Sequence, residues 1–560
     1  MSHPLLQADL RMRWIIVCTL IGLILPQWLV TTDMFDGANI WFARFIQNPE
    51  GIFLWLSNAN WWLAVLHYKL WFFLSDVTGV SYLVFVKLAM SAMLVCLYVE
   101  CVFFGREVLR LNSPQAQLAG LLCVASPCLY ILVNSASNLN LFCLWFVLLG
   151  HRLYWSGSAK IRTIGLFVLV VSFQINSNLV FALALEFVRW IDNPQQRKQR
   201  MLWFLVLVVT AITVYVSMRL LSPPQQIFVE YNKLLNPFDL QSLRRIFRAS
   251  AMFLTWGIIP LFAFLALAVT GPLYRRIAPP SCKSHDYEAI TWSRYAVLLF
   301  LSAAAAFPYI MVGKGPPLFT PTQYGDGLTE QVLRSVHSWY FAPTWANTSM
   351  RHGLLLSIPI AFLTWFVAQD TLKRLRVTMQ PHMVFFILLV LSLLWVLPSQ
   401  HNKLQQQYVQ NSLVKAFRAL PPAPAGIVEL RYSPSSDWLI WTNSANVILQ
   451  KAWGKTHHLG MFHAIDVYRD DLYWQYHAYM KSNDVINTPI FQNMVSLQGF
   501  PGEDCITKYV GTWPKPNILD AWLGGVFNER VAAATITMTE SSCVPGRQLA
   551  NPTPWKIVIP

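Results

Sequence analysis

The sequence predicts a polytopic α-helical membrane protein that ends in a C-terminal α+β domain. With 55% hydrophobic and 12% charged residues over 560 positions and a mean hydropathy of +0.42, the chain is too apolar for a soluble protein of this length. Several runs approach the ~20 apolar residues that a bilayer span requires. Basic residues recur in every second loop between these runs, which is typical of a polytopic topology.

Eleven apolar runs are candidate transmembrane helices. Their residues are 14–30, 81–104, 117–133, 139–153, 163–173, 178–190, 202–221, 251–273, 295–312, 354–368 and 383–397. The fourth, fifth and sixth runs are short and fit tilted or merged helices. The predicted number is therefore eleven, give or take about two.

The basic loops predict the orientation, because Lys and Arg resist translocation. Arg11 and Arg13 precede the first span. The later basic loops contain Arg106/Arg110, Arg152/Lys160/Arg162, Arg197/Lys198/Arg200, Arg275/Arg276 and Lys373/Arg374/Arg376. We expect these loops and the N-terminus to be cytoplasmic. The first run has no small-residue cleavage site after it, so we do not expect a cleaved signal peptide.

An odd number of spans places the residues after the last span on the outer face. The segment from Gln400 onward holds thirteen basic and eleven acidic residues, so the net charge of +15 belongs mostly to the loops. This distribution gives no basic footprint for nucleic acid, and no nucleic-acid partner is expected. The predicted domains are a transmembrane domain at 1–399 and an outer domain of typical size at 400–560.

The long outer loops are 31–80, 222–250 and 313–353, and the other outer turns are minimal. The protein therefore places its mass on the outer face, where we also expect its chemistry.

The C-terminal domain contains strand-like runs at 426–432, 438–441, 532–539 and 555–559, and helical spacing at 468–481, which together predict an α+β fold. Its seven tryptophans fit core packing better than sugar platforms, although both roles are common. Its only two cysteines, Cys505 and Cys543, are disulfide candidates in an oxidising compartment. Six other cysteines lie in apolar runs, where a thiol usually acts as a small hydrophobe.

The first outer loop opens with two carboxylates in "TTDMFDGANIWFARF", Asp33 and Asp36. Their position at the membrane surface puts them within reach of a lipid-borne substrate. A carboxylate there can serve as a general base. The alternative is that one of them caps a helix beginning near Gly37, since this spacing is also typical of a helix start.

Cations on the predicted outer face form the second group of candidates. Lys87 lies deep in the second span, which favours a functional role, and snorkelling to the headgroups is the alternative. Arg244 and Arg245, followed by Arg248, lie on a predicted amphipathic turn, where contact with anionic headgroups is at least as good an explanation as substrate binding. On the inner side we expect Glu100 and Glu186 to pair with cations, Glu186 with Arg189.

This layout resembles the GT-C glycosyltransferases, in particular the lipid A aminoarabinose transferase, protein O-mannosyltransferases and O-antigen glucosyltransferases. The resemblance covers the N-in first span, the acidic first outer loop, the aromatic stretch "WWLAVLHYKLWFFLSDVTGVSYLVFVKL", the many further spans and the C-terminal outer domain. It implies a bacterial inner (plasma) membrane enzyme with a periplasmic C-terminal domain. It also implies a polyprenyl-phosphate sugar donor, a lipid-linked or cell-envelope glycan acceptor such as lipopolysaccharide, and inversion at the sugar.

In that superfamily an acidic residue of the first outer loop acts on the acceptor. This chain lacks an adjacent acidic pair, so the match is open between Asp33 and Asp36. We favour Asp36, because Gly37 leaves its surroundings open to a substrate.

The leaving group in such a reaction is a lipid phosphate, whose developing charge requires cations aimed at it. The candidates for binding the donor phosphate are Lys69, His67, Lys87, Arg44, Arg244, Arg245 and Arg351. The Pro-, Gly- and aromatic-rich loop 313–353 is typical of segments that close over a site, and a simple connector is the alternative. The residues of this loop expected to line the cavity are Lys314, His337, Trp339 and Tyr340.

Three other classes of protein fit parts of this pattern. An O-antigen polymerase or ligase would also span the membrane many times, but we expect no terminal domain of this size there. A transporter would need internal repeats and broken helices at the midplane, and we find no repeat. A non-enzymatic glycan sensor is the third. No cofactor is expected, and a divalent metal stays an open alternative.

Overall fold

A computed structural model describes residues 10–29, 61–80, 82–126, 129, 139–156, 158–192, 197–221, 234–277, 291–314, 353–424, 426–432, 448–449, 451–454, 458–464, 503–513, 517–526 and 530–545. The chain divides into two compact units, each of which is described by itself. The first unit comprises Met1–Trp28, Trp62–Pro223 and Asn232–Gln400. The second comprises Leu29–Trp61, Pro224–Tyr231 and His401–Pro560.

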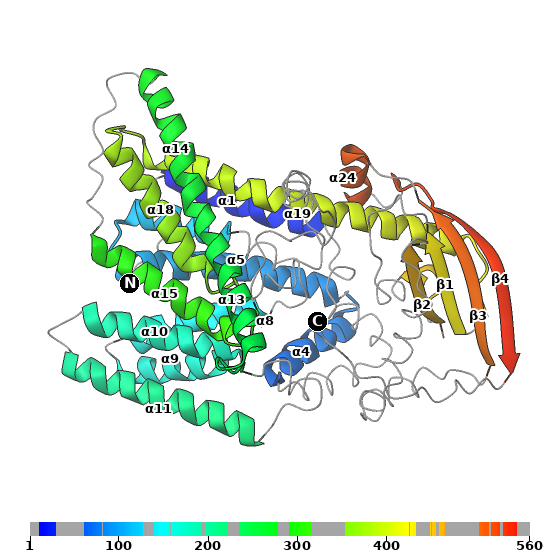
Figure 1. The fold of residues 1–560 in the computed structure, drawn as a ribbon, viewed down its shortest axis with the longest axis horizontal. Coiled ribbons are helices and arrows are strands. Elements are labelled where there is room, and N and C mark those ends of the chain that lie inside the picture. The colour runs from blue at the N-terminus through cyan, green and yellow to red at the C-terminus, as the bar shows by residue number, and fades with distance from the viewer. Residues whose placement is uncertain are drawn as a thin grey trace. The chain divides into compact units, whose positions relative to one another are not determined.

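The first unit is helical (Figure 1). Its helices are α1 (Leu10–Leu29), α4 (Trp62–Thr78), α5 (Tyr82–Glu107), α6 (Ser113–Val124), α8 (Leu139–Tyr154), α9 (Ala159–Ser172), α10 (Asn176–Asp192), α11 (Arg197–Leu221), α13 (Leu240–Leu254), α14 (Ile258–Ile277), α15 (Trp292–Ile310), α18 (Ser357–Arg374) and the first part of α19 (Pro381–Arg418). A 3₁₀ turn, Thr255–Gly257, joins α13 to α14.

Within the described residues, five helical segments are long and apolar enough to cross a membrane. They are Leu10–Leu29, Val84–Glu107, Arg200–Met218, Leu240–Arg276 and Trp292–Ile310. The membrane class predicted from composition is therefore supported. Every one of the eleven apolar runs overlaps a helix, but the count of eleven spans and their orientation stay predictions.

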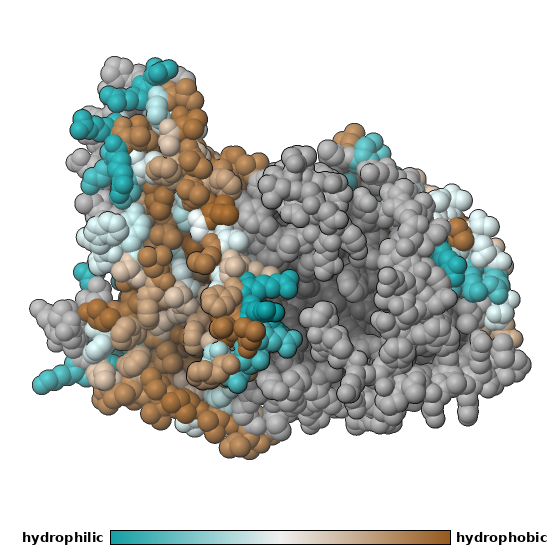
Figure 2. Space-filling view, viewed as in Figure 1, coloured by the Kyte–Doolittle hydropathy of each residue, from teal (hydrophilic) through white to brown (hydrophobic). Residues whose placement is uncertain are grey.

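The outer surface of these helices is apolar. On α11, Leu205, Val209 and Ile212 are exposed, and hydrophobic side chains cover much of the visible face of the first unit (Figure 2). An exposed apolar surface of this extent is what a lipid-facing helix presents. Inside the unit, Trp256 and Trp365 are among the largest fully buried side chains.

The hairpin of α8 and α9 packs through glycine. A Cβ placed on Gly165 would lie 2.8 Å from the carbonyl oxygen of Gly150, and one on Gly150 would lie 2.8 Å from Leu169 Cγ. Small residues at helix interfaces in membranes let the backbones approach this closely. The two glycines therefore set the contact between the two helices.

The second unit contains a four-stranded sheet in the order β2-β1-β3-β4. Its strands are β1 (Gly426–Tyr432), β2 (His458–Ala464), β3 (Glu503–Thr512) and β4 (Thr535–Pro545). β1 is parallel to β2 and β3, whereas β3 and β4 are antiparallel. The sheet packs on the last turns of α19, whose Leu413 and Phe417 share a core with Val428, Leu430 and Tyr509. A short helix, α24 (Ile518–Val526), belongs to the same unit.

The sequence predictions for this unit are met in part. β1 coincides with the predicted strand 426–432, and β4 overlaps the predicted strand 532–539. The sequence does not predict β2 and β3, because their histidines, charges and glycines hide the alternation of a strand. The predicted strands 438–441 and 555–559 and the helix 468–481 lie outside the described residues.

Cys505 and Cys543 face each other across β3 and β4 and form a disulfide. Their Cα atoms are 4.0 Å apart. The bridge joins the antiparallel pair near one end of the sheet. Trp453 donates hydrogen bonds to the carbonyl oxygens of Phe417 (2.7 Å) and Leu420 (3.3 Å), so this tryptophan caps the end of α19.

Candidate functional site

Two ion pairs, one of them with a buried carboxylate, tie helices together at one end of the first unit. This basic end is formed by Glu100 and Glu107 on α5, Arg152 on α8, Arg162 on α9, Glu186 and Arg189 on α10, and Arg200 on α11. Arg152 donates two hydrogen bonds of 2.8 Å to the carboxylate of Glu100, and Arg189 pairs with Glu107 at 2.7 Å. Arg200 donates to the backbone carbonyl of Arg189 at 2.9 Å. The charges of the basic end therefore serve to hold helices together.

The pairing of Glu100 with a cation is confirmed, but the pairing expected between Glu186 and Arg189 is wrong. The guanidinium of Arg189 reaches across to α5, where it meets Glu107. Glu186 instead accepts a hydrogen bond from the indole of Trp155 and lies 3.8 Å from His151 Nδ1, both on or just after α8. Both side chains of α10 therefore contact residues outside their own helix, instead of pairing with each other within it.

A second set of contacts joins helix ends that are far apart in the sequence. The backbone N–H of Leu63 at the start of α4 donates to the side chain of Gln174 in the turn between α9 and α10 (3.2 Å). Ser177 in the first turn of α10 hydrogen-bonds the hydroxyl of Tyr309 near the end of α15 (2.8 Å). The backbone N–H of Leu235 donates to the carbonyl of Met311 (2.9 Å). We call the region formed by the start of α4, the α9–α10 turn, residues 309–314 and α13 the rim.

Gly313 places Arg245 beside the segment that carries Lys314 at the rim. It adopts a φ of 68°, a conformation that favours glycine. A Cβ at this position would lie 3.2 Å from Arg245 Cβ and 3.4 Å from Arg245 Nε. Arg245 on α13 therefore packs on the residue that immediately precedes Lys314. Sequence reasoning did not single out this glycine, although its place directly before Lys314 was visible.

The arginines of α13 are exposed at the surface of the first unit. Asp239 caps the helix by accepting a hydrogen bond from the backbone N–H of Ser242 (2.8 Å), and this hydrogen bonding holds the pKa of its carboxyl below its ordinary value. Arg244, Arg245 and Arg248 are exposed, whereas Ala249 and Phe253 are buried. The ion pairs found between described residues do not include these three arginines. The predicted amphipathic turn is thus a capped helix with a cationic exposed face.

His67 and Lys69 lie on α4, which belongs to the segment 31–80 predicted as the first outer loop. The indole N–H of Trp71 donates to His67 Nε2 at 2.9 Å, so this ring nitrogen accepts a hydrogen bond from its own helix. The His67 ring packs on Phe142 with centroids 4.9 Å apart. The side chain of Lys69 is exposed on the same helix.

Lys87 has a structural partner. Its Nζ donates to the backbone carbonyl of Trp28 in the last turn of α1 (3.2 Å), and it lies 6.0 Å from the centre of the Trp28 ring. A cation on the last carbonyls of a helix stabilises its C-terminus. This contact favours a role in joining α1 to α5 over phosphate binding.

The remaining predicted site residues lie outside the described residues. They are Asp33, Asp36, Arg44, Arg351, His337, Trp339 and Tyr340. The predicted general base therefore stays a prediction. Within the described part of the chain no group of three His, Cys, Asp or Glu side chains is placed to hold a metal ion.

Comparison with known protein families, curated proteins and solved structures finds no match to this chain. The fold is that of a mostly helical membrane protein with a small sheet domain. A function for it has to be argued from the rim.

Proposed function

We propose that this protein is an integral membrane glycosyltransferase that works at the rim. It transfers a sugar from a polyprenyl-phosphate donor to a hydroxyl of a lipid-linked or cell-envelope glycan. The observation that carries the proposal is the rim itself, where α4 meets the α9–α10 turn and Arg245 of α13 packs on Gly313, the residue before Lys314. The sequence adds Asp33 and Asp36, which precede α4 in the chain. A carboxylate-bearing loop and a set of cations are the two parts that this reaction needs.

The chemistry assigns each part a role. The acceptor oxygen forms a bond to C1 of the sugar as the bond from C1 to the donor phosphate breaks, and the acceptor proton passes to the carboxylate of Asp36 or Asp33. The polyprenyl phosphate leaves with the bonding electron pair. Arg245, Arg244 and Lys314 stabilise the charge that develops on this phosphate. A single displacement of this kind inverts the sugar.

The charge distribution supports placing the rim on the outer face. Cytoplasmic ends of membrane helices carry an excess of Lys and Arg, and the basic end gathers arginines in the first or last turn of their helices, namely Arg152, Arg162, Arg189 and Arg200. In this proposal the second unit is periplasmic, where its Cys505–Cys543 disulfide would persist.

The proposed general base is tested by replacing each aspartate alone. Asp33→Asn and Asp36→Asn are assayed for sugar transfer from a polyprenyl-phosphate donor, with Asp76→Asn on the exposed side of α4 as the matched control. Loss of the base is expected to lower kcat at least ~100-fold in one of the two variants. The control should transfer at the wild-type rate. Unchanged transfer in both Asp33→Asn and Asp36→Asn would overturn the general-base assignment.

A further inference from the structure

α13 and α14 together are too long for the hydrocarbon core of a bilayer. The helical segment Leu240–Arg276 contains 37 residues, which measure about 55 Å at the rise of an α-helix. The core is about 30 Å thick, and at a tilt of about 40° the segment would still extend about 42 Å along the bilayer normal. A 3₁₀ turn, Thr255–Gly257, divides the segment into its two helices. One of them therefore lies outside the core.

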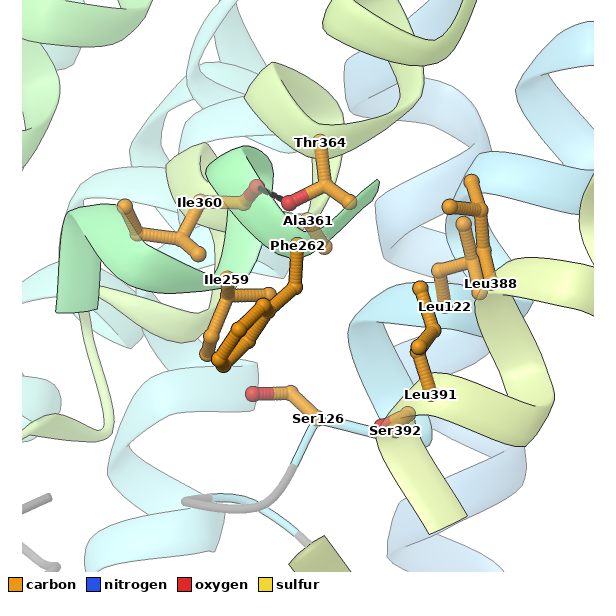
Figure 3. A pocket seen from close by; sticks show the side chains of 10 residues that line it. All are labelled: Leu122, Ser126, Ile259, Phe262, Ile360, Ala361, Thr364, Leu388, Leu391 and Ser392. Atoms are coloured by element: carbon orange, nitrogen blue, oxygen red, sulfur yellow. Dashed lines mark hydrogen bonds between the residues drawn. The ribbon is translucent and has the colours of Figure 1, made fainter. Parts of the chain in front are cut away.

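α14 is the helix that fits the core. Its 20 residues cover about 30 Å, and it carries no charged residue before Arg275. Figure 3 shows Ile259 and Phe262, in its first two turns, across from Leu388 and Leu391 of α19. Because α14 has apolar neighbours from its first turn onward, α13 is the helix that lies outside the core, at the membrane surface.

α13 packs on the unit with one face and exposes a second apolar face. Ala249 and Phe253 are buried. Leu240, Phe247 and Leu254 follow one another at every seventh residue, which is about two turns, so they share one face of the helix. We call these three residues the apolar row. Phe247 is 66% exposed and Leu254 is 78% exposed, so the row is not part of the core.

A cationic face lies beside the apolar row. Arg244 and Arg248 are one turn apart and both are exposed. The ion pairs between described residues include neither of them. Asp239 is the only acidic residue of the segment 234–277, and its carboxylate accepts a hydrogen bond from the backbone N–H of Ser242. Within the described part of the chain, the charge of this face is therefore not neutralised by an ion pair.

An exposed apolar face beside a basic face is the pattern of a helix that lies in the plane of the membrane interface. The turn that joins α13 to α14 has only three residues, so the apolar row is held next to the boundary of the core. The neighbour at that depth is the bilayer itself. Anionic lipids attract basic segments at the membrane surface, so the uncompensated charge favours an anionic phospholipid over a zwitterionic one.

We propose that α13 is an interfacial helix that binds anionic phospholipid, with the apolar row between the acyl chains and Arg248 on a headgroup phosphate. Arg244 adds positive charge to the same face. Arg245 packs on Gly313 and belongs to the rim. The inference goes beyond the proposed function and does not depend on it, because the ligand is a phospholipid of the surrounding membrane rather than the sugar donor.

Photolabelling tests this binding without requiring activity. The probe is phosphatidylglycerol with a diazirine next to its glycerol backbone, and the wild-type protein is reconstituted in phosphatidylcholine vesicles with rising mole fractions of it. After irradiation the labelled peptides are mapped. Label is expected on α13 around Phe247 and Leu254, and unlabelled phosphatidylglycerol should displace it, whereas added phosphatidylcholine should not. Equal displacement by the two lipids would overturn the proposal. Displacement by polyprenyl phosphate at a far lower mole fraction than by phosphatidylglycerol would also overturn it.

Replacement of Arg248 tests the headgroup contact. Arg248→Gln should raise the mole fraction of probe at half-maximal labelling about fivefold, which corresponds to about 1 kcal/mol for one basic residue at an anionic surface. Arg248→Lys keeps the charge and should label like the wild-type protein. Arg276→Gln, at the far end of α14, is the matched control and should leave the labelling of α13 unchanged. Equal half-maximal mole fractions in Arg248→Gln and Arg276→Gln would contradict the contact.

The labelling result and the transfer assay can fail separately. If no donor supports sugar transfer but anionic lipid selectively labels α13, the proposed function fails and the lipid site stands. If transfer proceeds and the label shows no preference for α13, the lipid site fails and the proposed function stands.

Discussion

The basic end and the rim use the same residue types in opposite ways. At the basic end Arg152 and Arg189 are engaged by Glu100 and Glu107, whose carboxylates come from another helix. At the rim the helix contacts are neutral, such as Ser177 with Tyr309 and Leu63 with Gln174, and the arginines of α13 are exposed. Ion pairs join helices at the basic end, whereas the contacts named here for the described part of the rim are neutral.

This difference indicates where a ligand can bind. A cation that already donates two hydrogen bonds to a buried carboxylate is not available to a phosphate. Arg245 is exposed and packs on Gly313. Its planar guanidinium therefore presents several N–H donors to an incoming anion. The comparison therefore assigns stability to the basic end and, under the proposed function, phosphate binding to the rim. Each of the following predictions tests one of these two assignments.

Arg152→Ala should produce the largest effect, because it leaves Glu100 buried without its partner. Removing one member of a buried pair costs about 3 kcal/mol or more. The measurement is the free energy of unfolding in mixed micelles as a denaturing detergent is added. Arg244→Ala at the rim is the control and should change it by less than about 0.5 kcal/mol. Replacing Glu100 and Arg152 together by Gln should cost less than Arg152→Ala, and a greater cost would contradict the pairing.

Gly165→Ala should be the next largest effect on stability. The added methyl would meet the backbone of Gly150 and Tyr154, which cannot move aside as a flexible side chain can. Overpacking of this kind costs about 1–3 kcal/mol, measured in the same titration. Gly257→Ala, where a Cβ meets nothing within 4 Å, is the control. Equal stability of the two variants would show that α8 and α9 do not pack through glycine.

Arg245→Gln should leave stability unchanged and raise KM for the polyprenyl-phosphate donor about tenfold, since it removes a charge-assisted bond to the phosphate. Arg276→Gln is the matched control, because Arg276 is exposed at the far end of α14. Initial rates over a range of donor concentrations give the comparison. A similar KM in the two variants would show that Arg245 contributes no more to donor binding than Arg276 does, which would contradict phosphate binding at the rim.

Asp239→Ala should have the smallest effect, a loosening of the first turn of α13 that increases its hydrogen–deuterium exchange. The pKa of Asp239 is lowered by its hydrogen bond from Ser242, so the cap stabilises α13 at pH values above the ordinary carboxyl pKa. That stabilisation is lost as the pH falls through the lowered value. Asp239→Asn keeps the acceptor and should exchange without this pH dependence. The same acidic rise in exchange in the wild-type protein and in the Asp239→Asn variant would contradict the cap.

The sequence predicted the membrane class and the helices well, because an apolar run is a local property and each of the eleven runs overlaps a helix. It predicted less of the second unit, where β2 is a strand through its pairing with β1, and β3 through its pairing with β1 and β4. Partners were the least predictable feature. The pairing of Arg189 with Glu107 and the packing of Arg245 on Gly313 join residues distant in the sequence, and such contacts follow from helix packing rather than from spacing.

The most direct test of the account is the release of polyprenyl phosphate by the purified wild-type protein in phosphatidylcholine vesicles. A panel of polyprenyl-phosphate sugars is supplied with and without a cell-envelope glycolipid acceptor, and free polyprenyl phosphate and glycosylated acceptor are both quantified. The account predicts that at least one donor yields the two products in equal amounts, and only when acceptor is present. Absence of both products with every donor, from protein that still unfolds cooperatively, would contradict it.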